Sequence, residues 1–392
     1  MRILDLFIIC ALALFWNGIV PVAGAFWGRR AWRLFRRRYD ELRLRPFLDY
    51  AARWEGEGKE FRFIGSFESL SGKNGAGGGF LWIKNDNLTV PVALDGALTY
   101  VLPEHDENPA AYEPGRETPQ RIKWEQLASL SGGARVYVGG QLLRVEGRPA
   151  FVSSRERPLL VILYDGPDRS LTARAIRAGR RRNEYWNTLT PYALALGAFS
   201  QFIVLLNYIR RPVFQPTVAA AIAALCLPVL PLIPPAFLFT ILYRRLWWQA
   251  RLFRAWRDLA LLPLRYLADK EGRTALPGGE PYAGMFLDDD ETARRMESGA
   301  LPRVLPESAV KARPRRWYVF GALKKDAGAG EFVAAPDDPQ ATWGTLPGDP
   351  EKLARRFTVR AYALEIASWL LLLCGIALNL FFAGLILSAF RR

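Results

Sequence analysis

The residues of this chain that could carry out catalysis or bind a metal are few and far apart. The single histidine, His105, lies in the polar stretch PEHDENP, where a lone histidine is typically a solvated side chain. The three cysteines, Cys10, Cys226 and Cys374, all lie in apolar stretches, which suggests neither disulfides nor a zinc site. The sequence therefore predicts no catalytic residue, no metal site and no cofactor, and we expect a protein that is not an enzyme.

Two further stretches have part of a ligand-binding pattern. GKNGAGGG at 72–79 is rich in glycine but lacks the Lys-Ser/Thr ending of a phosphate-binding loop, so a hairpin loop is the better interpretation. The acidic run at 288–291 could attract a divalent cation. Consecutive acids at the start of a helix usually interact with the helix dipole instead, so we predict no metal there.

Four long apolar stretches dominate the rest of the chain. They cover residues 3–27, 189–209, 218–243 and 364–390, and a helix needs about 20 apolar residues to cross a membrane. Buried helices of a large soluble protein are the alternative, which is disfavoured because every stretch is flanked by arginines. Eight arginines between positions 29 and 45 follow the first stretch, which indicates an uncleaved anchor rather than a signal peptide.

Basic residues gather at one end of each apolar stretch. The clusters occupy 29–45, 169–182, 244–257 and 352–360. Positive residues stay on the cytoplasmic side, so we expect a multi-pass inner-membrane protein with both termini outside and with 28–188 and 244–362 inside. Most of the net charge of +15 belongs to these clusters, because 51–165 holds 13 Lys and Arg against 15 Asp and Glu. This distribution favours anionic lipids as partners and makes nucleic acid an unlikely one.

A similar basic and aromatic segment follows the first and the third apolar stretch. RLFRRRYDELRLRPFLDYA at 33–51 and RLFRAWRDLALLPLRYLA at 251–268 begin with the same tetrad, by common descent or by shared chemistry. Their composition suits helices that lie in the headgroup layer. The residues that we expect at the membrane surface are Arg33, Arg36, Arg37, Arg38, Arg244, Arg245, Arg251 and Arg254.

Residues 59–165 change to short alternating segments separated by glycine turns. KEFRFIGSFESL, GGFLWIKN, LTVPVAL, ARVYVGGQLLRVEG, RPAFVSS and PLLVILYD are predicted strands, and WEQLASLSGG at 124–133 is a predicted short helix. In LTVPVAL, the side chains of Leu88, Val90, Val92 and Leu94 share one face, and Pro91 indicates an edge or a bulge.

GARVYVGGQLLRVEGRPAFV resembles the fourth and fifth strands of an OB-fold, a small Greek-key barrel. The resemblance covers about a quarter of the chain. It implies a ligand face on strands two and three, where Phe80, Trp82 and Lys84 lie. Packing of the two aromatic rings in the core of the barrel, or against a neighbouring element, is the alternative. The net negative charge offers single-stranded nucleic acid no obvious basic groove.

The second cytoplasmic region is rich in Pro, Gly and acidic residues. A capped helix is predicted at 288–299, and RRWYVFGAL and EFVAAP could pair as a hairpin. We expect the remainder to be irregular, and the region to need support from the first domain or from partners.

Four prolines interrupt the third apolar stretch. Pro228, Pro231, Pro234 and Pro235 remove helical hydrogen bonds, and the carbonyl groups that they leave need other partners. Broken helices of this kind line binding sites in transporters. A kinked packing helix is the alternative, favoured because no charged residue accompanies the prolines at mid-depth.

The predicted fold is a multi-pass α-helical membrane protein with four transmembrane helices, a cytoplasmic all-β OB-like barrel and a smaller irregular α+β region. The predicted parts are a first transmembrane helix at 1–27, a basic amphipathic helix at 28–50, the barrel at 51–166, a basic segment at 167–188, transmembrane helices at 189–209 and, kinked, at 216–243, a basic aromatic helix at 244–268, the second region at 269–362 and a last transmembrane helix at 363–390.

The predicted function is a docking or scaffold module for cytoplasmic protein partners. A transport or lipid-handling component that uses the proline-broken helix is the first alternative. A membrane-tethered nucleic-acid-binding protein is the second.

Overall fold

A computed structural model gives the fold of the chain, and two compact units make it up. The structure describes residues 3–49, 57–71, 79–102, 120–123, 134–145, 147–178, 180, 187–209, 215–226, 230–266, 273–297, 301–309, 314, 316–326 and 330–389. Unit 1 consists of Met1–Trp32, Gly179–Arg254 and Phe357–Arg392, and unit 2 of Arg33–Ala178 and Ala255–Arg356. The predicted helix at 124–133 and His105 lie outside the described residues.

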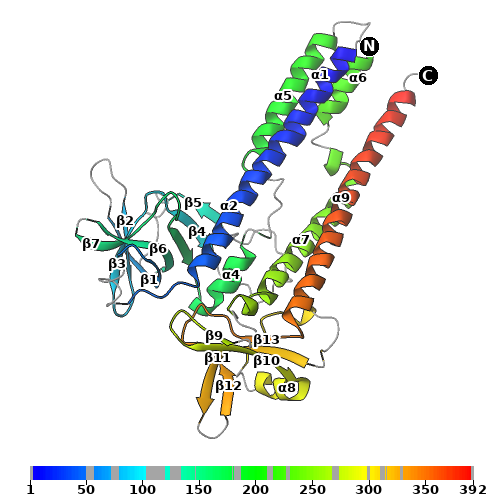
Figure 1. Cartoon of the computed structure of the whole chain (residues 1–392). Coiled ribbons are helices and arrows are strands. Elements are labelled where there is room, and N and C mark those ends of the chain that lie inside the picture. Colours follow the sequence, from blue (N-terminus) through cyan, green and yellow to red (C-terminus); the bar gives the residue numbers. More distant parts are fainter. Residues whose placement is uncertain are drawn as a thin grey trace. The chain divides into compact units, whose positions relative to one another are not determined.

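Unit 1 is helical. Its N-terminal helix runs from α1 (Ile3–Leu14) through a short π-helical stretch (Phe15–Ile19) into α2 (Val20–Leu42). The others are α5 (Thr190–Ile209), α6 (Gln215–Cys226), α7 (Ala236–Ala260) and α9 (Pro350–Ala389). The helices α1, α5 and α6 pack side by side, and α7 runs along α9 (Figure 1).

Three helices of the described chain are long and apolar enough to cross a membrane. They are Leu4–Leu42, Thr190–Ile209 and Pro350–Leu385. The third apolar stretch forms two helices, α6 and α7, separated by a short 3₁₀ turn (Leu230–Leu232), because prolines cannot continue the helical hydrogen bonds. A fourth membrane span at 216–243 therefore stays a prediction.

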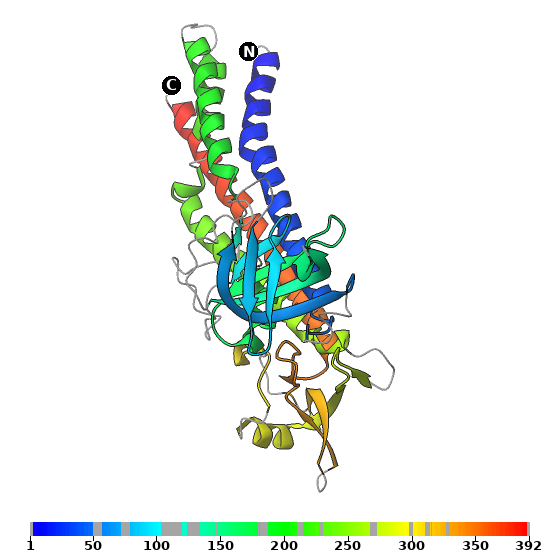
Figure 2. The same ribbon diagram turned by 90° about the vertical axis from the view of Figure 1, so that its left-hand side faces the viewer.

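Unit 2 contains a closed five-stranded mixed barrel (Figure 2). Its strands are β1 (Glu60–Ser71), β2 (Phe80–Lys84), β3 (Thr89–Ala93), β7 (Arg148–Val152) and β6 (Arg135–Val145), and β6 pairs back to β1. All pairs are antiparallel except β3 with β7. The strands β8 (Leu160–Tyr164), β4 (Leu98–Leu102) and β5 (Gln120–Ile122) extend the sheet beyond β6. All six predicted strands are confirmed, whereas β4 and β5 were missed.

The interior of the barrel is filled with apolar side chains. Leu88, Val90, Val92 and Leu94 are all buried there, as the alternation predicted. The two adjacent glycines of β6 allow close contacts in which a side chain would collide. A Cβ atom would lie 2.7 Å from Leu42 Cδ1 at Gly139, and 2.5 Å from Leu159 Cδ1 at Gly140.

The C-terminal part of α2 packs against the barrel sheet within unit 2. Phe35, Tyr39 and Leu42 are buried, and the ring of Phe35 lies 4.4 Å from that of Tyr100. The ring of Tyr39 lies 5.6 Å from that of Tyr137. Protein therefore covers this apolar face of the helix, for which the sequence favoured contact with lipid.

A second sheet completes unit 2. It consists of β12 (Gly330–Ala334), β11 (Arg316–Asp326), β10 (Pro281–Asp288) and β9 (Arg273–Ala275), with β13 (Gly344–Leu346) also paired to β11. The predicted hairpin of β11 with β12 is confirmed, as is the predicted helix, α8 (Asp289–Glu297). The prediction of an irregular remainder was wrong for β9, β10 and β13. In β10, Gly284 has no side chain, and the Tyr318 side chain occupies the space where a Cβ atom would lie.

Candidate functional site

The predicted ligand residues lie together on the outside of the barrel. Along β2, Leu81 and Ile83 point into the core, so the alternating Phe80, Trp82 and Lys84 point outward. The two aromatic side chains are half-buried and Lys84 is exposed. Phe80 and Trp82 do not belong to the barrel core, and packing of their rings against a neighbouring element stays a prediction. We name these three outward residues the β2 face.

Small residues flank the β2 face on both neighbouring strands. On β1, Ser66, Ser69 and Ser71 stand opposite Lys84, Trp82 and Phe80 in the register. On β3, the opposite residues are Thr89, Pro91 and Ala93. The residues opposite the two rings on the neighbouring strands are therefore all shorter than an indole or phenyl ring.

A β-bulge lies beside Trp82. The register of β1 with β2 shifts between Phe67 and Ser69, which makes Glu68 the extra residue. Glu68 is exposed, as is Lys84. Bulges recur next to functional sites because they redirect side chains. The β2 face and the adjacent part of β1 therefore combine two rings, serines and one charge of each sign.

A buried arginine joins the barrel to the segment that precedes β13. Arg62 of β1 has 1% of its side chain exposed. It donates hydrogen bonds to the carboxylate of Asp338 and, at 2.9 Å, to Gln340 Oε1. Its Nε also donates to the carbonyl oxygen of Arg45 at 2.6 Å, and its guanidinium stacks 4.1 Å from the centre of the Phe47 ring.

Further polar contacts surround the contact of Arg62 with Asp338 and Gln340, which we name the joint. The Tyr39 and Thr172 hydroxyls lie 2.9 Å apart, and Thr172 donates to the carbonyl oxygen of Gln340 at 2.9 Å. Arg43 is fully buried and donates to the Tyr266 hydroxyl at 3.2 Å. Such a network holds the barrel, the end of α2 and the second sheet in one arrangement, because buried polar groups tolerate few alternatives.

Burial changes the ionisation of the tyrosines around the joint. It raises the pKa of Tyr137, Tyr266 and Tyr282 above the usual value for tyrosine. The hydroxyl groups therefore stay protonated at neutral pH, and Tyr282 donates to the carbonyl oxygen of Thr342 at 2.7 Å. The charge of the joint comes from arginines and aspartates rather than from tyrosines.

The arginines predicted at the membrane surface have different surroundings. Arg33, Arg37, Arg244 and Arg245 are exposed, and Arg36 donates to the carbonyl oxygen of Ala178. Arg38 is buried and binds Glu60 at 2.5 Å. Arg251 and Arg254 both contact Glu365, with 11% and 14% of their side chains exposed. Arg38, Arg251 and Arg254 are thus each paired with an acidic side chain of the protein.

Side chains bind the carbonyl groups at the proline break in unit 1. Asn379 Nδ2 of α9 donates to the carbonyl oxygens of Leu230 at 2.7 Å and Ile233 at 2.9 Å. Thr240 Oγ1 donates to the carbonyl oxygen of Pro231 at 2.9 Å. These contacts favour the packing interpretation, because the protein itself provides donors for these three carbonyl groups, while Pro228 lies outside the described residues.

Within the described residues, no group of three or more His, Cys, Asp and Glu side chains could hold a metal ion. The acidic run at 288–291 ends β10 and opens α8, where Asp289 accepts a hydrogen bond from the Trp317 indole at 2.8 Å. Comparison of the chain with protein-family models, curated proteins and solved structures found no match.

Proposed function

We propose that this protein is a non-enzymatic docking protein of the inner membrane, which presents an OB-like barrel to a protein partner in the cytoplasm. In this proposal, four transmembrane segments anchor the chain, with both termini outside. The three long apolar helices support an anchored protein. The basic residues beside the apolar stretches support the orientation.

The position of the β2 face in the barrel supports the binding role. In the OB-like interpretation, β1, β2, β3, β6 and β7 are strands one to five, and OB-folds bind their ligands on the face of strands two and three. Apolar side chains fill the interior of the barrel, so a ligand would bind outside it. The outward direction of Phe80 and Trp82 is the observation on which this proposal rests.

The chemistry of the β2 face favours a protein segment as its ligand. Aromatic rings are enriched where proteins bind one another, since they bury a large area and lose little side-chain entropy. Lys84 and Glu68 would pair with opposite charges on the rim. Single-stranded nucleic acid also stacks on aromatic rings, but it needs a basic groove, and the net charge of residues 51–165 is negative.

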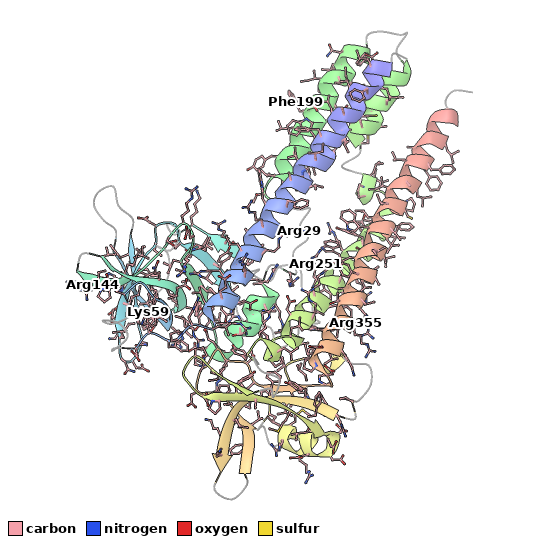
Figure 3. All side chains as sticks on the ribbon, viewed as in Figure 1. Arg29, Lys59, Arg144, Phe199, Arg251 and Arg355 are labelled. Atoms are coloured by element: carbon pink, nitrogen blue, oxygen red, sulfur yellow. The ribbon has the colours of Figure 1, made fainter. Side chains whose placement is uncertain are left out.

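Photocrosslinking in intact membranes tests the docking role. A photoreactive residue at position 84 should capture one defined protein, and capture should be lost when Trp82→Ala is added. The matched control has the photoreactive residue at position 144, an exposed site on β6 (Figure 3), and should give no such product. Equal capture from both positions, or capture unchanged by Trp82→Ala, would contradict the proposal. RNA in the product would favour the nucleic-acid alternative.

Reporter fusions test the orientation separately. Fusions after Asp165, Gln215 and Arg392 should report inside, outside and outside in this order, because the basic clusters keep 28–188 in the cytoplasm. An outside signal from the fusion after Asp165 would reverse the orientation and leave the β2 face on the wrong side for a cytoplasmic partner.

A further inference from the structure

One carboxylate of unit 1 has arginines around it from two other helices. Arg254 of α7 donates to both oxygens of Glu365 of α9, from Nε and Nη2, each at 2.6 Å. Arg251, one turn earlier on α7, lies 3.6 Å from Glu365 Oε1. Arg29 of α2 also attracts Glu365 electrostatically. Figure 3 labels Arg29 and Arg251 on their helices.

Positive charge exceeds negative charge throughout unit 1. The sequence of unit 1 contains fifteen arginines, no lysine and three acidic residues, which are Asp5, Glu184 and Glu365. Asp5 lies near the start of α1, where it accepts a hydrogen bond from the Tyr208 hydroxyl at 2.8 Å. Glu184 and Glu365 are therefore too few to balance the arginines at the basic ends of these helices. The resulting excess of positive charge attracts anions.

Aromatic rings hold two of the arginines around Glu365. The guanidinium of Arg251 stacks 4.2 Å from the centre of the Trp247 ring, and that of Arg254 lies 4.6 Å from the centre of the Tyr362 ring. Trp247 in turn contacts Trp369, with ring centres 6.0 Å apart. Tyrosine and tryptophan favour the level of the lipid headgroups, so the cluster lies at the depth of lipid phosphates if α7 and α9 cross the membrane.

We propose that Arg29, Arg251 and Arg254 bind the phosphate of one anionic phospholipid, with Glu365 orienting the guanidinium of Arg254. Arginine suits this role because a guanidinium carries five N–H donors, of which Arg254 gives only the pair on Nε and Nη2 to Glu365. Basic sites between membrane helices on the cytoplasmic side bind anionic headgroups in this way. The inference rests on the membrane placement in the proposed function, but not on the β2 face.

An apolar strip on α9 would accept the acyl chains of this lipid. Ile366, Leu370 and Leu373 repeat at helical spacing on one face of α9, which begins one residue after Glu365 and lies about a quarter-turn round the helix from it, and each has more than half of its surface exposed. Charged and apolar groups thus follow one another along a single helix in the order of headgroup and tail.

Native mass spectrometry of the full-length protein tests this site. Purified protein should retain phosphatidylglycerol or cardiolipin from an equal mixture with phosphatidylethanolamine. Arg251→Gln should reduce retention at least about fivefold, which corresponds to ~1 kcal/mol for one arginine beside an anionic lipid. Arg244→Gln, the matched control on the same helix, should change retention little. Equal losses in the two variants, or full retention by Arg251→Gln, would overturn the proposal.

Glu365→Gln separates a lipid site from a purely structural ion pair. Removal of the carboxylate leaves more positive charge for the phosphate, so retention should stay equal or rise while thermal stability falls. A fall in both would show that the cluster only joins α7 to α9. Competition by millimolar glycerol phosphate would identify a site for soluble phosphate and exclude the lipid. The two proposals can fail separately. Trp82→Ala tests the docking role through photocrosslinking, and this variant should leave lipid retention unchanged.

Discussion

Arg62 and Asp338 lie 276 residues apart in the chain and form an ion pair inside unit 2. The side chain of Arg62 is 1% exposed and that of Asp338 is 11% exposed. Since Arg62 belongs to the barrel and Asp338 precedes the last strand of the second sheet, this one contact ties the barrel to the second region, for which the sequence predicted support from the first domain or from partners. The neighbouring Gln340 adds a second acceptor.

Asp338→Ala should therefore destabilise the protein strongly. Loss of one partner of a buried pair leaves an uncompensated charge, which costs about 3–5 kcal/mol. We expect a destabilisation near the lower end of this range, because Asp338 is partly exposed and Gln340 still accepts a hydrogen bond from Arg62. Thermal unfolding of the purified protein measures the effect. Asp337→Ala is the control, since Asp337 is 84% exposed and binds Lys324 at the surface. Similar melting of both variants would contradict a role for the joint.

The glycines of the barrel should differ in how well they tolerate a methyl group. At Gly65, a Cβ atom would lie 2.5 Å from the backbone carbonyl oxygen of Lys84, which cannot move without separating β1 from β2. At Gly140, the nearest atom is the end of the Leu159 side chain.

Gly65→Ala should thus destabilise more than Gly140→Ala, and overpacking of this kind typically costs about 1–3 kcal/mol. Gly278→Ala has open space around the new methyl group and serves as the control. Melting temperatures of the three variants in one buffer give the order. A larger fall in melting temperature for Gly140→Ala than for Gly65→Ala would show that β1 and β2 can shift to make room for the methyl group.

Asn379→Leu should weaken the packing of α9 at the proline break. The variant keeps the approximate size of the side chain but removes the donor to two carbonyl groups, and hydrogen bonds between membrane helices contribute about 0.6 kcal/mol each on average. Unfolding in increasing denaturing detergent measures the difference. Asn207→Leu is the control, because Asn207 is exposed and donates to the carbonyl oxygen of Ile203 in its own helix. Equal stability of Asn379→Leu and the parent would show that the break finds other partners.

Alkaline conditions should destabilise unit 2 through its buried tyrosines. Burial raises the pKa of Tyr137 and Tyr282 in the folded state. Below the ordinary tyrosine pKa of about 10, these side chains are uncharged in both the folded and the unfolded state. Above that pH, the unfolded state loses protons first, so the free energy of unfolding falls as the pH rises.

Tyr137→Phe should make this fall less steep. The Tyr137 hydroxyl oxygen is buried without a hydrogen-bond partner among the described residues, so its removal should be neutral or slightly stabilising at pH 7. A titration to alkaline pH, in which phenolate absorbance reports tyrosine ionisation and circular dichroism reports unfolding, tests the pH dependence. Thermal unfolding at pH 7 tests the neutral or slightly stabilising effect. Ionisation of all tyrosines at the ordinary pKa before any unfolding would contradict the buried state.

Features carried by neighbouring residues were predictable from the sequence. The apolar stretches that become α1, α5 and α9 are visible as uninterrupted runs, because a helix depends on consecutive residues. Alternation likewise predicted the strands and the core positions of Leu88 and Val90, since successive side chains of a strand point to opposite sides. The outward Phe80 and Trp82 follow from the same rule, once the inward residues are known.

Only the tertiary structure decided what each arginine does. Arg37 and Arg38 are neighbours of the same type, yet Arg37 is exposed and Arg38 binds Glu60 in the interior, because α2 turns one of them toward the sheet. Nothing near Arg62 in the chain announces Asp338, and nothing near Asn379 announces the carbonyl groups of Leu230 and Ile233. Residue type and periodicity determine which side of an element a residue occupies. The partner that it meets depends on contacts between distant segments, which form only when the chain has folded.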